Sequence, residues 1–298
     1  RILIHIIPPL LPRPRMIRTL GTLLIAVIFL GSCTKGDKVP SYLIVPSVDL
    51  STSGLQGSNT KNITDTWVYV NDEFMGSWEL PARIPVLKEG SVNVRVDAGV
   101  KRNGFYDERI RYPFYTPWTG TAELVRTNTA TIAPVVNYTE QATFWIEGFE
   151  DAGFSFLVAD SLDHLLRYSA SEYPDLTVDG TSFGGFELDQ SNPTITIYSD
   201  QDFSASGGAT FLEMNYRSNV NLEVGMFYVL DGIAQSSFIL GVTRSDREGT
   251  GMIWKKIYID LSAAFNTSIS QRDIHIKATI PSDQTSGTVY LDNIKLVR

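Results

Sequence analysis

Histidine and cysteine, the side chains that most often perform catalysis or bind transition metals, are scarce in this sequence. The chain has 298 residues, three histidines and one cysteine. His164 and His275 are far apart, whereas a hydrolytic nucleophile needs an adjacent base and zinc needs several ligands at regular spacing. The sequence has no Gly-x-Ser-x-Gly motif and no Gly-rich phosphate loop. These observations predict that catalytic residues and transition-metal sites are absent.

Carboxylates are plentiful, and pairs of them could in principle hydrolyse glycosides. Glu147, Glu150, Glu187 and Glu213 are examples among 33 acidic residues. Nothing in the sequence raises the pKa of one carboxyl above another, so carboxylates on solvated strand faces are the simpler interpretation. We therefore predict that the protein is not an enzyme.

Exposed aromatic rings could stack on sugars or contact a protein. The segment 112–118 (YPFYTPW) offers Tyr112, Tyr115 and Trp118, and Trp118 is the best exposed candidate. The same segment could be a surface for a partner protein or a seam between two modules. Trp254 lies in a stretch that looks core-forming, so we expect it to be buried.

The single cysteine follows a pattern typical of lipid attachment. Arg18 precedes an apolar run of eleven residues, 20–30, which is shorter than the ~20 residues of a transmembrane helix. Leu30-Gly31-Ser32-Cys33 resembles the lipobox of bacterial lipoproteins, in which the cysteine is acylated and becomes the first mature residue. The resemblance implies that Cys33 anchors the protein to a membrane. Two or three acyl chains give stable anchoring.

This interpretation divides the N-terminal region into three parts. Residues 1–15 contain four prolines and read as an upstream mis-start, and residues 16–32 form the signal peptide. Residues 33–61 are expected to be the lipid anchor and a flexible tether, because they are rich in Ser, Thr and Gly. A short apolar patch within them, Tyr42 to Val45, could pair as an edge strand.

The charge of the mature chain is strongly negative. Removing the four arginines of residues 1–32 leaves 21 basic against 33 acidic residues, a net charge of −12. Such a chain repels phosphate backbones, so we expect no nucleic-acid partner.

Residues 62–139 are expected to form a small β-sandwich. Residues 66–70 read as a strand, Asn71-Asp72 as a turn, and residues 92–96 alternate as a half-buried strand does. The order of these pieces resembles the PEGA-type surface domain, which is non-catalytic.

Residues 140–298 contain short strands at regular spacing, a pattern typical of an antiparallel sandwich. The opening Gly148-Phe149-Glu150-Asp151 and the terminal stretch 289–296 (VYLDNIKL) resemble galactose-binding-like jelly rolls found in carbohydrate-binding modules. In those modules, a carboxylate near the first strand and an Asp on the last strand often hold a structural Ca²⁺. Glu150 and Asp292 match these positions, so the resemblance implies a calcium site there. Oxygen ligands suit this hard cation.

The sequence thus predicts an all-β, non-catalytic cell-envelope lipoprotein of the kind found in Bacteroidota. Our first hypothesis is a protein-binding or scaffolding accessory subunit at the outer membrane, and the alternative is a carbohydrate-binding surface lipoprotein. Thr34 to Lys38 hold one acid and two lysines, so the periplasmic and extracellular faces of the membrane both stay open.

Overall fold

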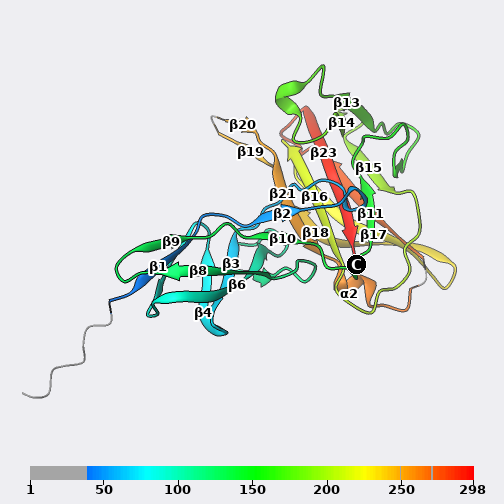
Figure 1. Ribbon diagram of the computed structural model, residues 1–298. Coiled ribbons are helices and arrows are strands. Elements are labelled where there is room, and N and C mark those ends of the chain that lie inside the picture. The colour runs from blue at the N-terminus through cyan, green and yellow to red at the C-terminus, as the bar shows by residue number, and fades with distance from the viewer. Residues whose placement is uncertain (1–38, 249, 270) are drawn as a thin grey trace, which may run out of the picture. The chain divides into compact units, whose positions relative to one another are not determined.

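The computed structural model describes residues 39–248, 250–269 and 271–298, and nearly all of its regular structure is β-strand (Figure 1). Two groups of sheets follow one another along the chain. This arrangement confirms the predicted all-β fold, with a small N-terminal sandwich followed by an antiparallel jelly roll. The predicted mis-start, signal peptide and Cys33 lie outside the described residues.

The first module is built on a five-stranded antiparallel sheet with the order β4-β3-β6-β7, in which β8 also pairs with β6. Asn71 and Asp72 have φ angles of 48° and 64° and form the two-residue turn that the sequence predicted between β3 and β4. The strands of this sheet are β3 (Asp65–Val70), β4 (Glu73–Glu79), β6 (Gly90–Lys101), β7 (Arg109–Arg111) and β8 (Trp118–Leu124).

A second layer closes this module and contains residues that the sequence assigned to the tether. β1 (Ser41–Val45) lies between antiparallel β5 (Ala82–Val86) and parallel β9 (Thr129–Thr131). β2 (Asp49–Ser51) pairs in parallel with β10 (Val135–Asn137). Leu43 and Val45 are fully buried. The predicted tether over 33–61 is therefore wrong for residues 41–51, because partner strands far along the chain fix these short apolar segments.

The jelly roll consists of two antiparallel sheets. The first has the order β13-β14-β23-β16-β21 with β11 on β23, and the second has the order β12-β15-β22-β17-β18. Strand alternation sends one set of side chains between the sheets, where residues such as Met214, Ile259 and Leu291 form the core. The first sheet contains β11 (Phe144–Glu147), β13 (Leu166–Ser169), β14 (Ser182–Asp189), β16 (Phe211–Ser218), β21 (Lys255–Asp260) and β23 (Ser286–Val297). The second contains β12 (Phe156–Val158), β15 (Thr194–Ser199), β17 (Leu222–Leu230), β18 (Ile233–Val242) and β22 (Arg272–Thr279).

The remaining elements are short. They are η1 (Gly54–Gln56), η2 (Pro174–Leu176), α2 (Ser262–Phe265) and a small hairpin of β19 (Asp246–Arg247) and β20 (Gly251–Met252). Among the described residues, no helix has both the length and the apolar character required to span a bilayer.

The two sandwiches share part of a hydrophobic core. Residues Ser41–Arg298 form one compact unit, and the core of the first module includes Phe211, Tyr258 and Val297 of the jelly roll. The outer face of the β16–β21 region is therefore covered in part by the first module. This packing creates the recess described next.

Candidate functional site

A cleft of about 830 Å³ lies against β16 and β21 of the jelly roll. Its other walls are the turn Asn103–Phe105 of the first module, the segment Asn59–Asn62, and the hairpin that contains Arg247. The volume falls within the range of ~300–1,000 Å³ that is typical of small-molecule sites. We call it the aromatic cleft, after Phe105 and Trp254 in its lining.

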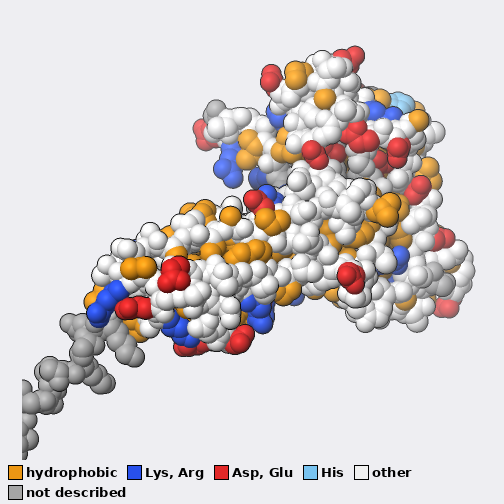
Figure 2. Space-filling model, in the orientation of Figure 1, with side chains coloured by type: hydrophobic (Ala, Val, Ile, Leu, Met, Phe, Trp, Pro, Cys, Tyr) orange, Lys and Arg blue, Asp and Glu red, His pale blue; other side chains and the backbone are white. Residues whose placement is uncertain are grey.

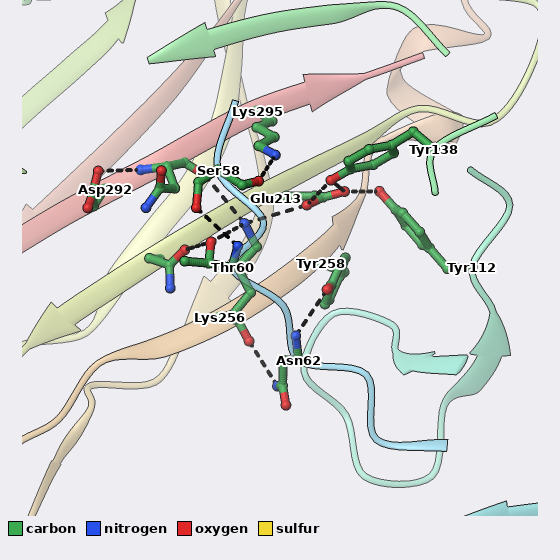
Figure 3. Close-up of polar contacts among 12 residues, drawn as sticks. Ser58, Thr60, Asn62, Tyr112, Tyr138, Glu213, Lys256, Tyr258, Asp292 and Lys295 are labelled. Carbon is green, nitrogen blue, oxygen red and sulfur yellow. Dashed lines mark hydrogen bonds and ion pairs between the residues drawn. The ribbon is translucent and has the colours of Figure 1, made fainter. Parts of the chain in front are cut away.

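The segment Asn59–Asn62 is held in place by hydrogen bonds to the jelly roll (Figure 3). Thr60 Oγ1 donates to Asn215 Oδ1 over 2.8 Å, and Lys295 Nζ donates to the Ser58 carbonyl over 2.5 Å. The Asn62 backbone N–H donates to the Tyr258 hydroxyl over 3.1 Å, and its side-chain amide donates to the Lys256 carbonyl over 3.0 Å. The segment is thus a fixed wall of the aromatic cleft.

A buried polar network lies beside this wall, where the modules meet (Figure 3). Glu213, which is 0% exposed, accepts hydrogen bonds from Tyr112 at 2.7 Å and from Tyr138 at 2.9 and 3.0 Å. Its carboxylate also lies 3.5 Å from Lys256 Nζ. We call this network and its tyrosines the seam. Because each partner belongs to a different part of the chain, the seam fixes the first module against β16 and β21.

Tyr112 and Lys256 in the seam, and Lys295 beside it, have shifted pKa values. Burial, with Glu213 nearby, raises the pKa of Tyr112. Burial lowers the pKa of Lys256, although Glu213 opposes that shift. Burial also lowers the pKa of Lys295 to about 8. Burial disfavours the charged form of each of these groups.

Three aromatic residues line the aromatic cleft, of which Tyr216 is 5% exposed and Phe105 and Trp254 are more accessible. Phe105 is 46% exposed at the tip of a turn. Trp254 is half-buried, donates from Nε1 to the Leu176 carbonyl over 2.6 Å, and packs edge-on against Phe183 with 5.9 Å between the ring centroids. The hydrogen bond and the packing fix the orientation of the indole, so it can serve as a rigid platform.

Four asparagines line the same cleft: Asn59, Asn62, Asn103 and Asn215. Within the part of the chain that the structure describes, the Asn62 Oδ1 and Asn215 Nδ2 atoms have no hydrogen-bond partner, and neither does the Asn59 side chain. An amide can both donate and accept hydrogen bonds, as sugar hydroxyls do. The cleft therefore combines aromatic faces with polar groups that are free to fix the orientation of a ligand.

An aromatic cluster continues from Trp254 across the same sheet. Phe183 stacks on Tyr168 at 5.2 Å with an interplanar angle of 10°, and Tyr290 packs edge-on against both. Burial, together with Glu187, raises the pKa of Tyr168 to about 12. The cluster supports Trp254 and extends the aromatic surface beyond the cleft.

The aromatic residues that the sequence singled out do not line the aromatic cleft. Tyr112 and Tyr115 are 3% and 6% exposed and lie where the modules meet, so their rings are not exposed to a ligand or partner as the prediction required. Tyr112 packs edge-on against Phe211 and Tyr258, and the Tyr115 hydroxyl lies 3.2 Å from the Tyr258 hydroxyl, which explains their burial. Trp118 is half-buried and lies over Gly120, its neighbour on the same strand.

Little in the sequence indicated that the residues lining the cleft belong to a binding site. Trp254 was expected in the core, but it directly precedes β21 and lines the cleft. Phe105 lies in an aromatic and basic stretch without distinctive spacing, and Asn59 and Asn62 lie in the segment expected to be a tether. Only the pairing of distant strands brings these residues together.

The predicted calcium ligands give mixed observations. Asp292 is 1% exposed, and its Oδ2 atom has no partner, as a cation ligand would before binding. In contrast, both oxygens of Glu150 accept hydrogen bonds, from Thr181 and Ser182. Among the described residues, no group of three acidic, His or Cys side chains could hold a metal ion. The calcium site stays a prediction that rests on Asp292.

No family model matches the chain, and no curated protein matches it. Among solved structures, TmCBM61 in complex with β-1,4-galactotriose matches with 15% identity, over 51% of this chain and 94% of that one, at a TM-score of 0.34. A structure described as the basis for the promiscuous specificity of carbohydrate-binding modules from the β-sandwich superfamily matches with 14% identity, over 79% and 86%, at 0.37. A family 29 carbohydrate-binding module variant matches with 9% identity, over 53% and 86%, at 0.34. Sequence identities and TM-scores this low do not support the assignment of a function. The function is therefore argued from the chemistry of the aromatic cleft.

Proposed function

We propose that this protein binds carbohydrate in the aromatic cleft without cleaving it. The observation that carries the proposal is the lining: the rings of Phe105 and Trp254, and asparagine amides that keep atoms without a partner among the described residues, surround a concave space. Apolar faces of sugar rings stack on aromatic side chains, and the remaining hydroxyls need hydrogen-bond partners. We therefore prefer carbohydrate binding, which was the alternative hypothesis from the sequence, to the scaffolding role, which was the first.

The same lining supports binding over hydrolysis. Glycoside hydrolysis uses two carboxyl groups that flank the scissile bond. The described residues that line the aromatic cleft contain no Asp, Glu or His. A bound glycan would therefore meet no pair of carboxyl groups of the kind that hydrolyses glycosidic bonds.

The proposal is tested by measuring binding of the purified protein to a panel of soluble polysaccharides, using affinity electrophoresis and calorimetry. We expect at least one glycan to bind and Phe105→Ala to weaken that binding by about tenfold, because stacking of one ring contributes roughly 1–2 kcal/mol. Phe74→Ala is the matched control, since Phe74 is similarly exposed, at 53%, but lies outside the cleft. The proposal fails if no glycan binds, or if both variants bind like the wild type.

We further propose that Cys33 is acylated and that the protein is held at the outer membrane. The support is the order of Leu30-Gly31-Ser32-Cys33 after an apolar run. A lipid anchor would place the aromatic cleft next to polysaccharide at the cell envelope. Which face of the membrane the protein occupies can be measured by protease accessibility in intact cells.

A scaffolding role is the second candidate, and one observation favours it. Leu230 and Ile233 flank the turn of the β17–β18 hairpin and are 50% and 62% exposed. Exposed apolar residues at one place on a surface often mark a protein contact. A pull-down from envelope extract should recover a stoichiometric partner that Ile233→Asp loses. If wild type and variant recover the same proteins, the hairpin is not the contact.

A further inference from the structure

The aromatic cleft has a charge opposite to that of the protein. The whole chain has a net charge of −8, yet Lys61, Arg247, Lys255 and Lys256 line the cleft, and none of its described lining residues is acidic. Figure 2 shows Lys and Arg side chains beside the notch beneath the β19–β20 hairpin, whose place is labelled in Figure 1. A positive recess in a negative protein concentrates anions.

Two of these four cations are already neutralised. Lys61 Nζ lies 2.9 Å from Asp49, and Lys256 Nζ lies 3.5 Å from Glu213 in the seam. Their charges are balanced within the protein and contribute little to attracting a ligand.

The other two cations, Lys255 and Arg247, have no carboxylate partner within the described residues. Lys255 Nζ donates to the Arg244 carbonyl over 3.2 Å, and the nearby Asp246 is paired with Arg244 at 2.8 Å. Lys255 and Arg247 line the same cleft. Burial and the like charge of Arg247 lower the pKa of Lys255, and Asp246 opposes that shift. Two cations that line one cleft, neither in an ion pair with a carboxylate of the described residues, can bind an anion there.

From these charges we infer that the glycan bound in the aromatic cleft is acidic, with a carboxylate or sulfate group that pairs with Lys255 and Arg247. This inference rests on the proposed function and adds the chemical class of the ligand. Trp254 and Phe105 supply the stacking faces, the asparagines bind hydroxyls, and the two cations select the charged sugar. A neutral glycan would leave both cations without a partner.

Two pairs of polymers test the charge while keeping the sugar backbone similar. Polygalacturonate is compared with its fully methyl-esterified form for the carboxylate, and carrageenan with agarose for the sulfate. We expect at least one acidic member to bind about tenfold or more tightly than its neutral counterpart, since a charge-assisted contact is roughly twice as strong as a neutral one. Its affinity should fall as salt increases, because salt screens exposed charges.

Charge-removing variants identify the contacts. Lys255→Gln and Arg247→Gln should each weaken binding of the acidic polymer by about tenfold, while Arg247→Lys should keep most of it. Lys277→Gln is the matched control, because it removes a charge from β22 on the other sheet. Circular dichroism and thermal melting establish that every variant is folded.

The outcomes separate this inference from the function on which it rests. Equal binding of neutral and acidic members, with no effect of salt or of Lys255→Gln, overturns the acidic ligand but leaves carbohydrate binding intact. Binding of no polymer overturns both. Single-stranded DNA is included as a polyanion without acidic sugars, and binding as tight as that of the acidic glycan would overturn the assignment to a glycan.

Discussion

Glu213 sits at the junction of the two modules, on the sheet face that turns away from the jelly-roll core. A carboxylate with 0% exposure is tolerated only when it is paired and hydrogen-bonded. Two tyrosines from the first module and one lysine from the jelly roll meet that need. The alternating strand pattern put Glu213 on a polar face, and the sequence suggested a solvated one. Its burial depends on residues more than 70 positions away.

Removing this carboxylate should destabilise the whole described unit. We predict that Glu213→Ala lowers the free energy of unfolding by about 3–5 kcal/mol, because the buried Lys256 loses its counter-ion and two hydroxyls lose their acceptor. Urea denaturation followed by tryptophan fluorescence measures the change. Glu123→Ala on the exposed face of β8 is the control and should change stability by less than about 0.5 kcal/mol. A similarly small loss for Glu213→Ala would show that the seam contributes little to stability.

Asp292 should make stability depend on pH. Burial, with Asp179 and Glu150 nearby, raises its pKa to about 8, well above the ~3.9 of an unfolded Asp. The protonated form is thus favoured by folding, and its stabilisation is complete below about pH 4 and is lost as pH rises through about 8. Relative to Asp292→Asn, the wild type should lose up to about 1.4 kcal/mol per pH unit within that window. Denaturation curves of both proteins at several pH values measure this. Parallel pH profiles would show that Asp292 is ionised in the fold.

Calcium would compete with the proton at the same carboxylate. We predict that millimolar calcium raises the melting temperature, and that the increase is larger at about pH 8 than at pH 5, because the ion binds only the ionised form. Chelator-treated protein is the reference, and Asp292→Asn should abolish the increase. If the wild type melts at the same temperature with calcium and with chelator, Asp292 holds no structural cation.

At the scale of elements, the sequence predicted the local features of the fold better than the long-range ones. The alternating stretch 92–96 and the Asn71-Asp72 turn appear as predicted, because both are decided by neighbouring residues. β1 was expected at most as an edge strand, because five residues give little periodicity; it is central, and its partners lie about 40 and 90 positions later. The seam and the aromatic cleft depend on the same kind of distant pairing, so none of their contacts could be predicted from spacing.

The central position of β1 leads to a prediction about Leu43. Its side chain is 0% exposed, and β1 pairs on both edges. Leu43→Ala should lower the free energy of unfolding by about 2–5 kcal/mol, the usual cost of a large-to-small change in a core. Leu55→Ala is the control, because Leu55 is 88% exposed in η1. Equal stability of the two variants would mean that residues 41–45 do behave as a tether.

At the scale of the whole molecule, the seam and the aromatic cleft are two consequences of one packing arrangement. The first module covers part of the β16–β21 face, and what it leaves open becomes the cleft. Segment Asn59–Asn62 contributes to both, since it is tied to the jelly roll and lines the recess. Binding should therefore need both modules, as neither one alone provides Phe105 together with Trp254.

The predicted anchor decides where this binding unit is held. Without residues 1–32 the chain would have a net charge of −12, which anionic headgroups repel, so under our proposal the acyl chains of Cys33 provide the stable membrane association. We predict that Cys33→Ser moves the protein from the membrane fraction to the soluble fraction, with glycan affinity and melting temperature unchanged. Metabolic labelling with a palmitate analogue should mark the wild type only. A Cys33→Ser protein that stays in the membrane fraction would contradict lipid anchoring and point to a membrane-bound partner instead. The Ile233→Asp variant would then show whether the β17–β18 hairpin is that contact.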